Sequence, residues 1–139
     1  MVKRSVLLAM IIALYSTTSH AIPNDEEYSL CLSKTSTDAG ITACMKEEIE
    51  VVKTEILNTK KDLQYLLHNQ KGIDTKDIDL MEKKFNGYAQ SYCTYNTMAK
   101  QGRGYSNDYL KSECELNMYL RYYRNIKAIY GMIMTDIQG

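Results

Sequence analysis

Hydrophobic residues recur at spacings of three and four through most of the chain, the period that places them on one face of an α-helix. The first run contains Met45, Ile49, Val52, Ile56, Leu63 and Leu66, with Thr59 in its one gap. The second run contains Ile78, Met81, Phe85, Tyr88, Tyr92, Tyr95 and Ala99. The third run contains Tyr109, Leu116, Tyr119, Leu120, Tyr123, Ile126, Tyr130 and Ile133. No segment alternates clearly enough to predict a strand, so the pattern predicts three long amphipathic helices.

Glycines and capping residues mark where these helices end and begin. Gly72 and Gly102–Gly104 interrupt the helix-forming runs, and glycine is the residue that most often follows a helix. Thr37–Asp38, Asp74 and Ser106 are suited to cap the three helix N-termini. Because the connections are short, consecutive helices run antiparallel. The predicted fold class is all-α: a small antiparallel bundle of three main helices, preceded by a short N-terminal helical segment and stapled by two disulfides.

The first 21 residues have the layout of a cleavable signal peptide. Lys3 and Arg4 form a basic start, an apolar run follows from Val6 to Tyr15, and Ser19 and Ala21 are small residues three apart. A membrane anchor is the alternative, but a spanning helix needs about 20 apolar residues. We therefore expect cleavage after Ala21, and a single helical domain over residues 22–139 without a membrane span. This predicts a periplasmic or secreted protein.

Four cysteines in a small exported chain indicate two disulfides, because export leads to an oxidising compartment. They are Cys31, Cys44, Cys93 and Cys114. Cys93 lies eleven residues before Gly104 and Cys114 ten residues after it, and in an antiparallel hairpin residues at nearly equal distances from the turn are side by side. Cys31 and Cys44 are similarly placed about the start of the first long helix. The preferred pairs are therefore Cys31–Cys44 and Cys93–Cys114. Because all four cysteines gather at one end of the bundle, the two crossed connectivities also stay open.

The rest of the sequence shows no recognisable metal site, catalytic group or nucleic-acid-binding composition. The cysteine spacings of 13, 49 and 21 residues lack the close pairs of zinc sites. Without Lys3 and Arg4 the chain has 15 basic and 17 acidic residues, a balance that does not favour nucleic acid. His68 is the one histidine after the signal peptide, so no histidine-based catalytic group is recognisable. We expect no catalytic residue, cofactor or metal site, and predict that the protein is not an enzyme.

The chain has twelve tyrosines, and these are its main candidates for binding a partner. Those on the helical runs are expected to fill a small core and place their hydroxyl groups at its edge. They are Tyr88, Tyr92, Tyr95, Tyr119, Tyr123 and Tyr130. Tyr65, Tyr105 and Tyr122 lie off the runs or at a turn, which makes them candidates for binding a protein partner. Arg121 and Arg124 are basic candidates for the same surface, although such runs commonly form a solvated face.

Four segments resemble the lysozyme inhibitor LprI-like N-terminal domain family, a family of small exported bacterial helical domains. "CLSKTSTDAGITAC" is similar to the family's first cysteine pair, and "ILNT" to its Leu-Asn step. "FNGYAQSYC" and "CELNMYLRYYRNI" resemble the segments around its later cysteines. The resemblance runs from Cys31 to about Ile126.

The chain departs from the family pattern at several positions. Phe85 stands where tryptophan is usual, Ala89 where arginine is common and Lys61 where tyrosine is usual. Tyr119 and Tyr122 replace a threonine and an arginine of the closing helix. The resemblance implies a rigid binding protein that inhibits a lysozyme-type, peptidoglycan-cleaving hydrolase. The alternative is an envelope accessory, structural or virulence-associated protein without inhibitory activity.

Overall fold

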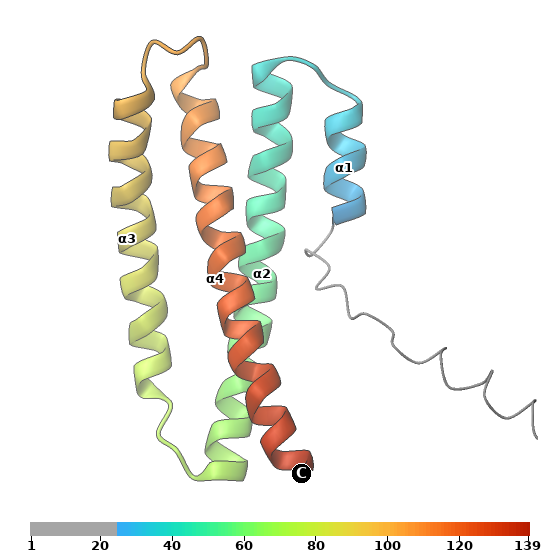
Figure 1. The fold of residues 1–139 in the computed structure, drawn as a ribbon, viewed down its shortest axis with the longest axis vertical. Helices are drawn as coiled ribbons and strands as arrows, with labels where there is room; N and C mark the ends of the chain where they lie inside the picture. Colours follow the sequence, from blue (N-terminus) through green and yellow to red (C-terminus); the bar gives the residue numbers. More distant parts are fainter. Residues whose placement is uncertain (1–24) are drawn as a thin grey trace, which may run out of the picture.

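Four α-helices account for nearly all of residues 25–139, the part of the chain that the structure, a computed structural model, describes (Figure 1). They are α1 (Asp25–Ser33), α2 (Asp38–Lys71), α3 (Lys76–Lys100) and α4 (Asn107–Gln138). Residues 25–139 contain no strand. The predicted all-α bundle of three long helices and a short N-terminal one is therefore confirmed. The predicted signal peptide and its cleavage site lie outside the described residues.

The helix ends follow the capping chemistry of the sequence, with one shift. The Thr37 hydroxyl accepts a hydrogen bond from the Gly40 amide at 3.1 Å, and α2 ends at Gly72 in the left-handed conformation, with φ of 64°. The Ser106 hydroxyl caps α4 in the same way. For α3, the predicted cap Asp74 lies one residue too early. The N-cap position is Thr75, whose side chain makes no capping bond, while Asp74 accepts from the Lys76 amide.

Helix α4 lies between α2 and α3 and packs against both (Figure 1). Helix α1 packs on the far side of α2, so α3, α4, α2 and α1 stand side by side at the upper end in the view of Figure 1. That end carries the α1–α2 and α3–α4 turns, and the α2–α3 turn is at the opposite end. Helices α2 and α3 make little direct contact with each other. The bundle is therefore open along one side.

The hydrophobic core lies between α2 and α4. It consists of Met45, Ile49, Val52, Ile56, Leu116, Tyr123 and Ile126. The first predicted run is confirmed as the buried face of α2, since its residues from Met45 to Leu63 are buried. The partly buried Tyr119, Leu120 and Tyr122 extend the core along α4.

Helix α3 is turned differently from its predicted orientation. Its buried residues are Ala89, Cys93 and Thr97. Tyr88, Tyr92 and Tyr95 were expected in the core, but they are 58%, 44% and 72% exposed. The expectation that these three rings fill the core is therefore wrong. The helix exists where the pattern placed it, yet a neighbouring face points inward.

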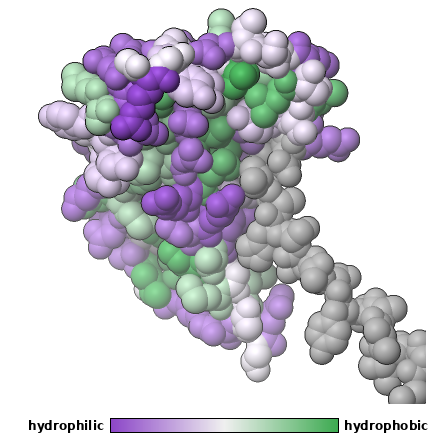
Figure 2. All heavy atoms as spheres, turned by 45° about the horizontal axis from the view of Figure 1, so that its top comes forward, coloured by the Kyte–Doolittle hydropathy of each residue, from purple (hydrophilic) through white to green (hydrophobic). Residues whose placement is uncertain are grey.

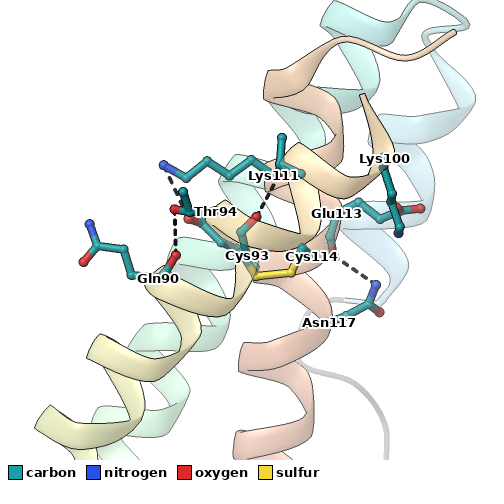
Figure 3. The surroundings of a disulfide bond; sticks show 10 residues. Gln90, Cys93, Thr94, Lys100, Lys111, Glu113, Cys114 and Asn117 are labelled. Carbon is teal, nitrogen blue, oxygen red and sulfur yellow. Dashed lines mark hydrogen bonds and ion pairs between the residues drawn. A yellow bond between two sulfur atoms is a disulfide. The ribbon is translucent and has the colours of Figure 1, made fainter. Parts of the chain in front are cut away.

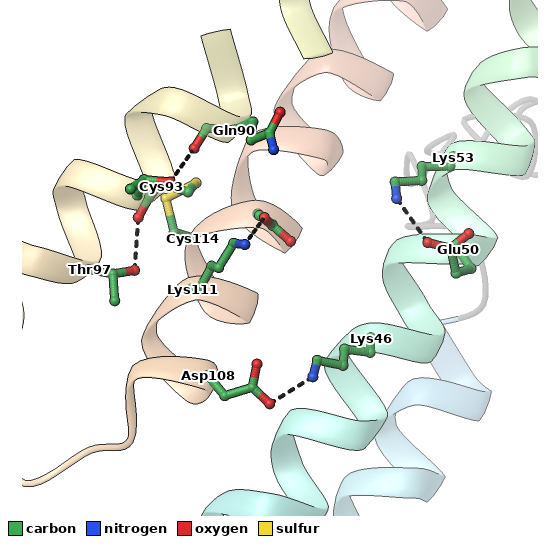
Figure 4. A network of polar contacts seen from close by, with 11 residues as sticks. Lys46, Glu50, Lys53, Gln90, Cys93, Thr97, Asp108, Lys111 and Cys114 are labelled. Carbon is green, nitrogen blue, oxygen red and sulfur yellow. Dashed lines mark hydrogen bonds and ion pairs between the residues drawn. A yellow bond between two sulfur atoms is a disulfide. The ribbon is translucent and has the colours of Figure 1, made fainter. Parts of the chain in front are cut away.

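The two disulfides join neighbouring helices at the same end of the molecule. Cys31–Cys44 connects α1 to α2 and Cys93–Cys114 connects α3 to α4, with Cα–Cα distances of 5.8 and 5.5 Å. The structure thus contains the preferred local pairing. Figure 3 shows the Cys93–Cys114 bridge between the two helices. Cys93 is completely buried, and the Thr97 hydroxyl donates to its carbonyl oxygen at 2.8 Å, as Figure 4 also shows.

Ion pairs tie the long helices together at two levels. Lys46 of α2 lies 2.7 Å from Asp108 of α4, near the disulfide end (Figure 4). Lys60 of α2 contacts Glu82 and Asp79 of α3 on the open side of the bundle. The Lys60 side chain is only 15% exposed. Its pKa is raised, first by the hydrogen bond to Glu82, against the lowering effect of burial.

Candidate functional surface

The outward side of α3 is the most apolar exposed surface of any described helix. We call it the α3 outer face; it consists of Leu80, Met81, Tyr88, Tyr92, Tyr95 and Met98, each at least 38% exposed. The rings of Tyr88 and Tyr92 lie 5.8 Å apart, so part of the face is a continuous aromatic surface. Exposed apolar patches commonly mark interaction sites, and tyrosine and methionine are enriched in protein interfaces.

Three of the six side chains of the α3 outer face are tyrosines, and the other three are leucine and methionine. Figure 2, turned from the view of Figure 1, shows hydrophobic residues in small separate groups among hydrophilic ones. Tyrosine carries a hydroxyl group that keeps its outer end wet while its ring offers apolar contact. Such a surface stays soluble without a partner and can still bury large rings when one binds.

A groove of about 370 Å³ runs between α3 and α4, and we call it the α3–α4 groove. Its aromatic lining consists of Phe85, Tyr88, Tyr92 and Tyr122. Its polar lining consists of Asn96, Lys100, Glu113, Asn117, Arg121 and Asn125. Phe85 and Tyr122 stack face to face, with ring centroids 4.1 Å apart. This stack joins the two walls of the groove, since Phe85 belongs to α3 and Tyr122 to α4.

The lining residues of this groove repeat every four positions on both helices. Tyr88, Tyr92, Asn96 and Lys100 line it from α3, and Glu113, Asn117, Arg121 and Asn125 line it from α4. Residues four apart lie on one face of a helix. Because α3 and α4 are antiparallel, the two series run along opposite walls of the groove. Lys100 and Glu113 form an ion pair at 3.8 Å at one end.

A larger cleft of about 530 Å³ opens where α2 and α3 stand apart. Tyr119 and Tyr122 of α4 line it, with Lys53 and Leu57 of α2 and Gly87 of α3 at its sides. Burial raises the pKa of both tyrosines, with smaller contributions from nearby charges. Burial alone would lower the pKa of Lys53, but its hydrogen bond to Glu50 and neighbouring charges raise it overall.

The partner-binding candidates chosen from the sequence do not form one cluster. Arg121 and Tyr122 both line the α3–α4 groove. Tyr122 is half-buried and packs against the core, so it is less accessible than its off-run position suggested. Tyr65 is 65% exposed on α2, and Tyr105 is 53% exposed in the α3–α4 turn, stacked on Tyr109. Arg124 is exposed on α4. Neither the groove nor the cleft is lined by Tyr65, Tyr105 or Arg124.

Sequence reasoning missed the amides and the exposed tyrosines of α3. Asn96, Asn117 and Asn125 gained no role from the hydrophobic pattern. Their spacing was a usable signal, because Asn117, Arg121 and Asn125 are four apart on one helix. Within the described residues, no group of three potential metal-ligating side chains gathers. None of the four described helices is both long and apolar enough to cross a bilayer.

Comparison of this chain with protein-family models, with curated proteins and with solved structures finds no match. The resemblance to the LprI-like domain family therefore stays a prediction from the sequence.

Proposed function

We propose that this protein is an exported, disulfide-stabilised binding protein without catalytic activity, whose partner is another protein. The observation that carries the proposal is the α3 outer face, where three exposed tyrosines and two methionines occupy one side of a helix. Tyr95 and Met98 of this face line neither the α3–α4 groove nor the cleft between α2 and α3. Large rings that are held on a rigid helix lose little conformational freedom when a partner covers them.

The two disulfides support the exported location. Both bridges join helices close to a turn, and such bonds persist in oxidising compartments such as the periplasm or the extracellular space. They also support rigid presentation, because Cys93 anchors α3 to α4 directly behind its exposed face. A periplasmic or secreted location is therefore part of the proposal.

The partner suggested by the sequence resemblance is a lysozyme-type hydrolase. The excess of two acidic residues after signal removal would attract a cationic lysozyme. Of the departures from the family pattern, Phe85 and Ala89 lie on α3, the helix that carries the three exposed tyrosines, and Tyr119 and Tyr122 lie on α4. Inhibition of a peptidoglycan-cleaving enzyme is therefore the first specific function to test.

The test uses the oxidised chain from residue 22 to 139. Binding to a lysozyme-type hydrolase is measured by titration calorimetry, and inhibition by the rate of cell-wall lysis. Tyr95→Ala and Met98→Ala should each weaken binding, because both side chains are exposed on the α3 outer face. Met132→Ala is the matched control for Met98→Ala, since it removes a similarly exposed methionine from α4.

The second candidate function is that of an envelope accessory protein that binds a partner but does not inhibit a hydrolase. The same α3 outer face would serve it. Capture of envelope proteins on the oxidised chain, with the Tyr95→Ala variant in parallel, separates the two. A captured protein that depends on Tyr95, together with unchanged lysis rates, favours the accessory role. Capture that is insensitive to Tyr95→Ala and Met98→Ala contradicts the proposed surface.

A further inference from the structure

We infer that the α3–α4 groove is a binding site for an acidic oligosaccharide. The groove shares Tyr88 and Tyr92 with the α3 outer face. The two proposals are tested separately, because Tyr95 and Met98 do not line the groove, whereas Arg121 and the amides do. It begins with the two series of groove residues that repeat every four positions. Four helical residues rise about 6 Å, a repeat comparable to the length of one pyranose ring with its linking oxygen.

The hydrogen-bonding groups of the groove match sugar hydroxyls. A side-chain amide both donates and accepts hydrogen bonds, as do pairs of neighbouring hydroxyls on a sugar ring. The Oδ1 atom of Asn96 is buried and accepts no hydrogen bond from the described residues. Asn117 donates to the carbonyl oxygen of Glu113 at 2.9 Å, which holds its side chain in position beside the groove (Figure 3). Asn125 adds a third amide, exposed at the wall.

The charge of the groove indicates that the ligand is acidic. Lys100 and Glu113 compensate each other at 3.8 Å. Arg121 is exposed and forms no ion pair with any of residues 25–139. The groove therefore has one uncompensated positive charge. A guanidinium group presents a planar set of donors that fits a carboxylate with two parallel hydrogen bonds.

The aromatic lining supplies the apolar part of the site. Tyr88 and Tyr92 expose their rings beside the amides, on the α3 wall. Sugar rings have flat faces of C–H groups that pack against aromatic rings. The α3 wall of the groove offers tyrosine rings, and the α4 wall offers amides and an arginine. The groove can therefore contact both surfaces of a saccharide.

A peptide is the competing class of ligand, and the walls of the groove favour it less. Both walls are α-helices, whose backbone N–H and C=O groups already bond to each other. An extended peptide would find no backbone edge to pair with, unlike a peptide that joins a sheet. Met118 is the one methionine of the lining, and the groove is otherwise lined mainly by aromatic, amide and charged side chains.

The experiment uses the oxidised chain of residues 22–139 and three probes: a galacturonate tetrasaccharide, a neutral glucose tetrasaccharide and tetraglutamate. Binding is followed through the ¹⁵N NMR signals of the side-chain amides. We expect the acidic tetrasaccharide to shift the Asn117 and Asn125 amide signals. Arg121→Gln should weaken its binding about tenfold, the loss of a charge-assisted pair. Arg124→Gln, which removes an arginine outside the groove, is the matched control and should change binding less than about twofold.

Three outcomes overturn the inference. The first is no binding of the acidic tetrasaccharide up to about 10 mM. The second is equal loss in the Arg121→Gln and Arg124→Gln variants, which would mean attraction by overall charge. The third is binding of tetraglutamate, or of the neutral tetrasaccharide, as tightly as the acidic sugar. Tyr92→Ala adds a further readout, because it should weaken the acidic tetrasaccharide while leaving tetraglutamate unchanged.

Discussion

Two glycines inside helices have opposite surroundings. A methyl group on Gly87 of α3 would meet no atom within 4 Å. A methyl group on Gly40 of α2 would lie 1.8 Å from the Thr35 hydroxyl oxygen. Close packing within the chain therefore explains Gly40 but not Gly87.

This difference predicts opposite effects of alanine. Gly87→Ala should raise the free energy of unfolding by up to about 1 kcal/mol, the difference in helix propensity between glycine and alanine. Gly40→Ala should lower it by about 1–3 kcal/mol, because the Thr35 side chain must move. Urea unfolding of the oxidised variants measures both. A destabilised Gly87→Ala variant would show that this position has an unrecognised packing role.

The buried phenol groups of Tyr119 and Tyr122 should make the free energy of unfolding fall in alkaline solution. Burial raises the pKa of each phenol above its ordinary value of 10.0. As pH rises through 10, the unfolded chain releases these protons before the folded one does. The folded state then binds more protons, so its stability, complete below pH 10, falls as pH rises through the raised pKa values.

The measurement is urea unfolding at several pH values between about 8 and 11, a range that brackets the ordinary tyrosine pKa. The Tyr119→Phe/Tyr122→Phe double variant should show a smaller loss over this range than the parent protein. Tyr65→Phe is the control, because its ring is exposed on α2. An identical loss in the parent and the double variant would exclude the two buried phenols as its cause.

At the scale of elements, the three long helices were predictable but the rotation of α3 was not predicted by its hydrophobic run. The run follows Tyr88, Tyr92 and Tyr95, whereas the inward face is centred on Cys93. A disulfide to Cys114 requires Cys93 to face α4, and this rotates the tyrosines away. The same reasoning that paired the cysteines could therefore have placed the tyrosines outside. Periodicity alone could not, because tyrosine suits both a core edge and an exposed surface.

The Cys93–Cys114 bridge is expected to matter more than its companion. Helix α3 buries only Ala89, Cys93 and Thr97, so it has few apolar contacts beyond the bridge. Cys93→Ser/Cys114→Ser should lower the free energy of unfolding by about 2–5 kcal/mol. Amide hydrogen exchange should then accelerate along α3 while the α2–α4 core stays protected.

Removal of the other bridge provides the comparison. Cys31→Ser/Cys44→Ser should accelerate exchange mainly in α1, which packs mainly against α2. Its closed loop is also shorter, with a sequence separation of 13 against 21, and shorter loops contribute less entropy to stability. Equal global destabilisation by both changes would contradict this division of roles.

At the scale of the whole molecule, the open side of the bundle was beyond sequence reasoning. The third run predicted one buried stripe on α4, yet α4 packs on two sides, against α2 and α3. Its buried residues accordingly include Ser112 and Cys114 as well as Leu116, Tyr123 and Ile126. A run of hydrophobic residues shows which face is apolar but not how many neighbours share it.

Lys60 of α2 is expected to make the most stabilising ion pair to α3 across this open side. Lys60→Ala should lower the free energy of unfolding by about 1–3 kcal/mol, because it leaves the partly buried Glu82 without its partner. Lys46→Ala should change it by less than about 1 kcal/mol, since both Lys46 and Asp108 are largely exposed. Urea unfolding at low and high salt tests the pair. Equal effects would mean that the Lys60 contact acts as an ordinary surface ion pair.

Both disulfides lie at one end of the molecule, and this makes the Cys93–Cys114 bridge a pivot for α3. Toward the α2–α3 turn no covalent bond joins α3 to α4, so small rotations about the pivot change the spacing of the two helices most at that end. The width of the α3–α4 groove should then vary least from Cys93 to Lys100, which lie between the bridge and the α3–α4 turn, and most beyond the bridge, toward Phe85. Spin-label distances across the groove would show a distribution that broadens from Lys100–Glu113 toward Lys84–Ala128. The groove would then open and close at the end that lies away from the disulfide, while the end beside the α3–α4 turn keeps its width.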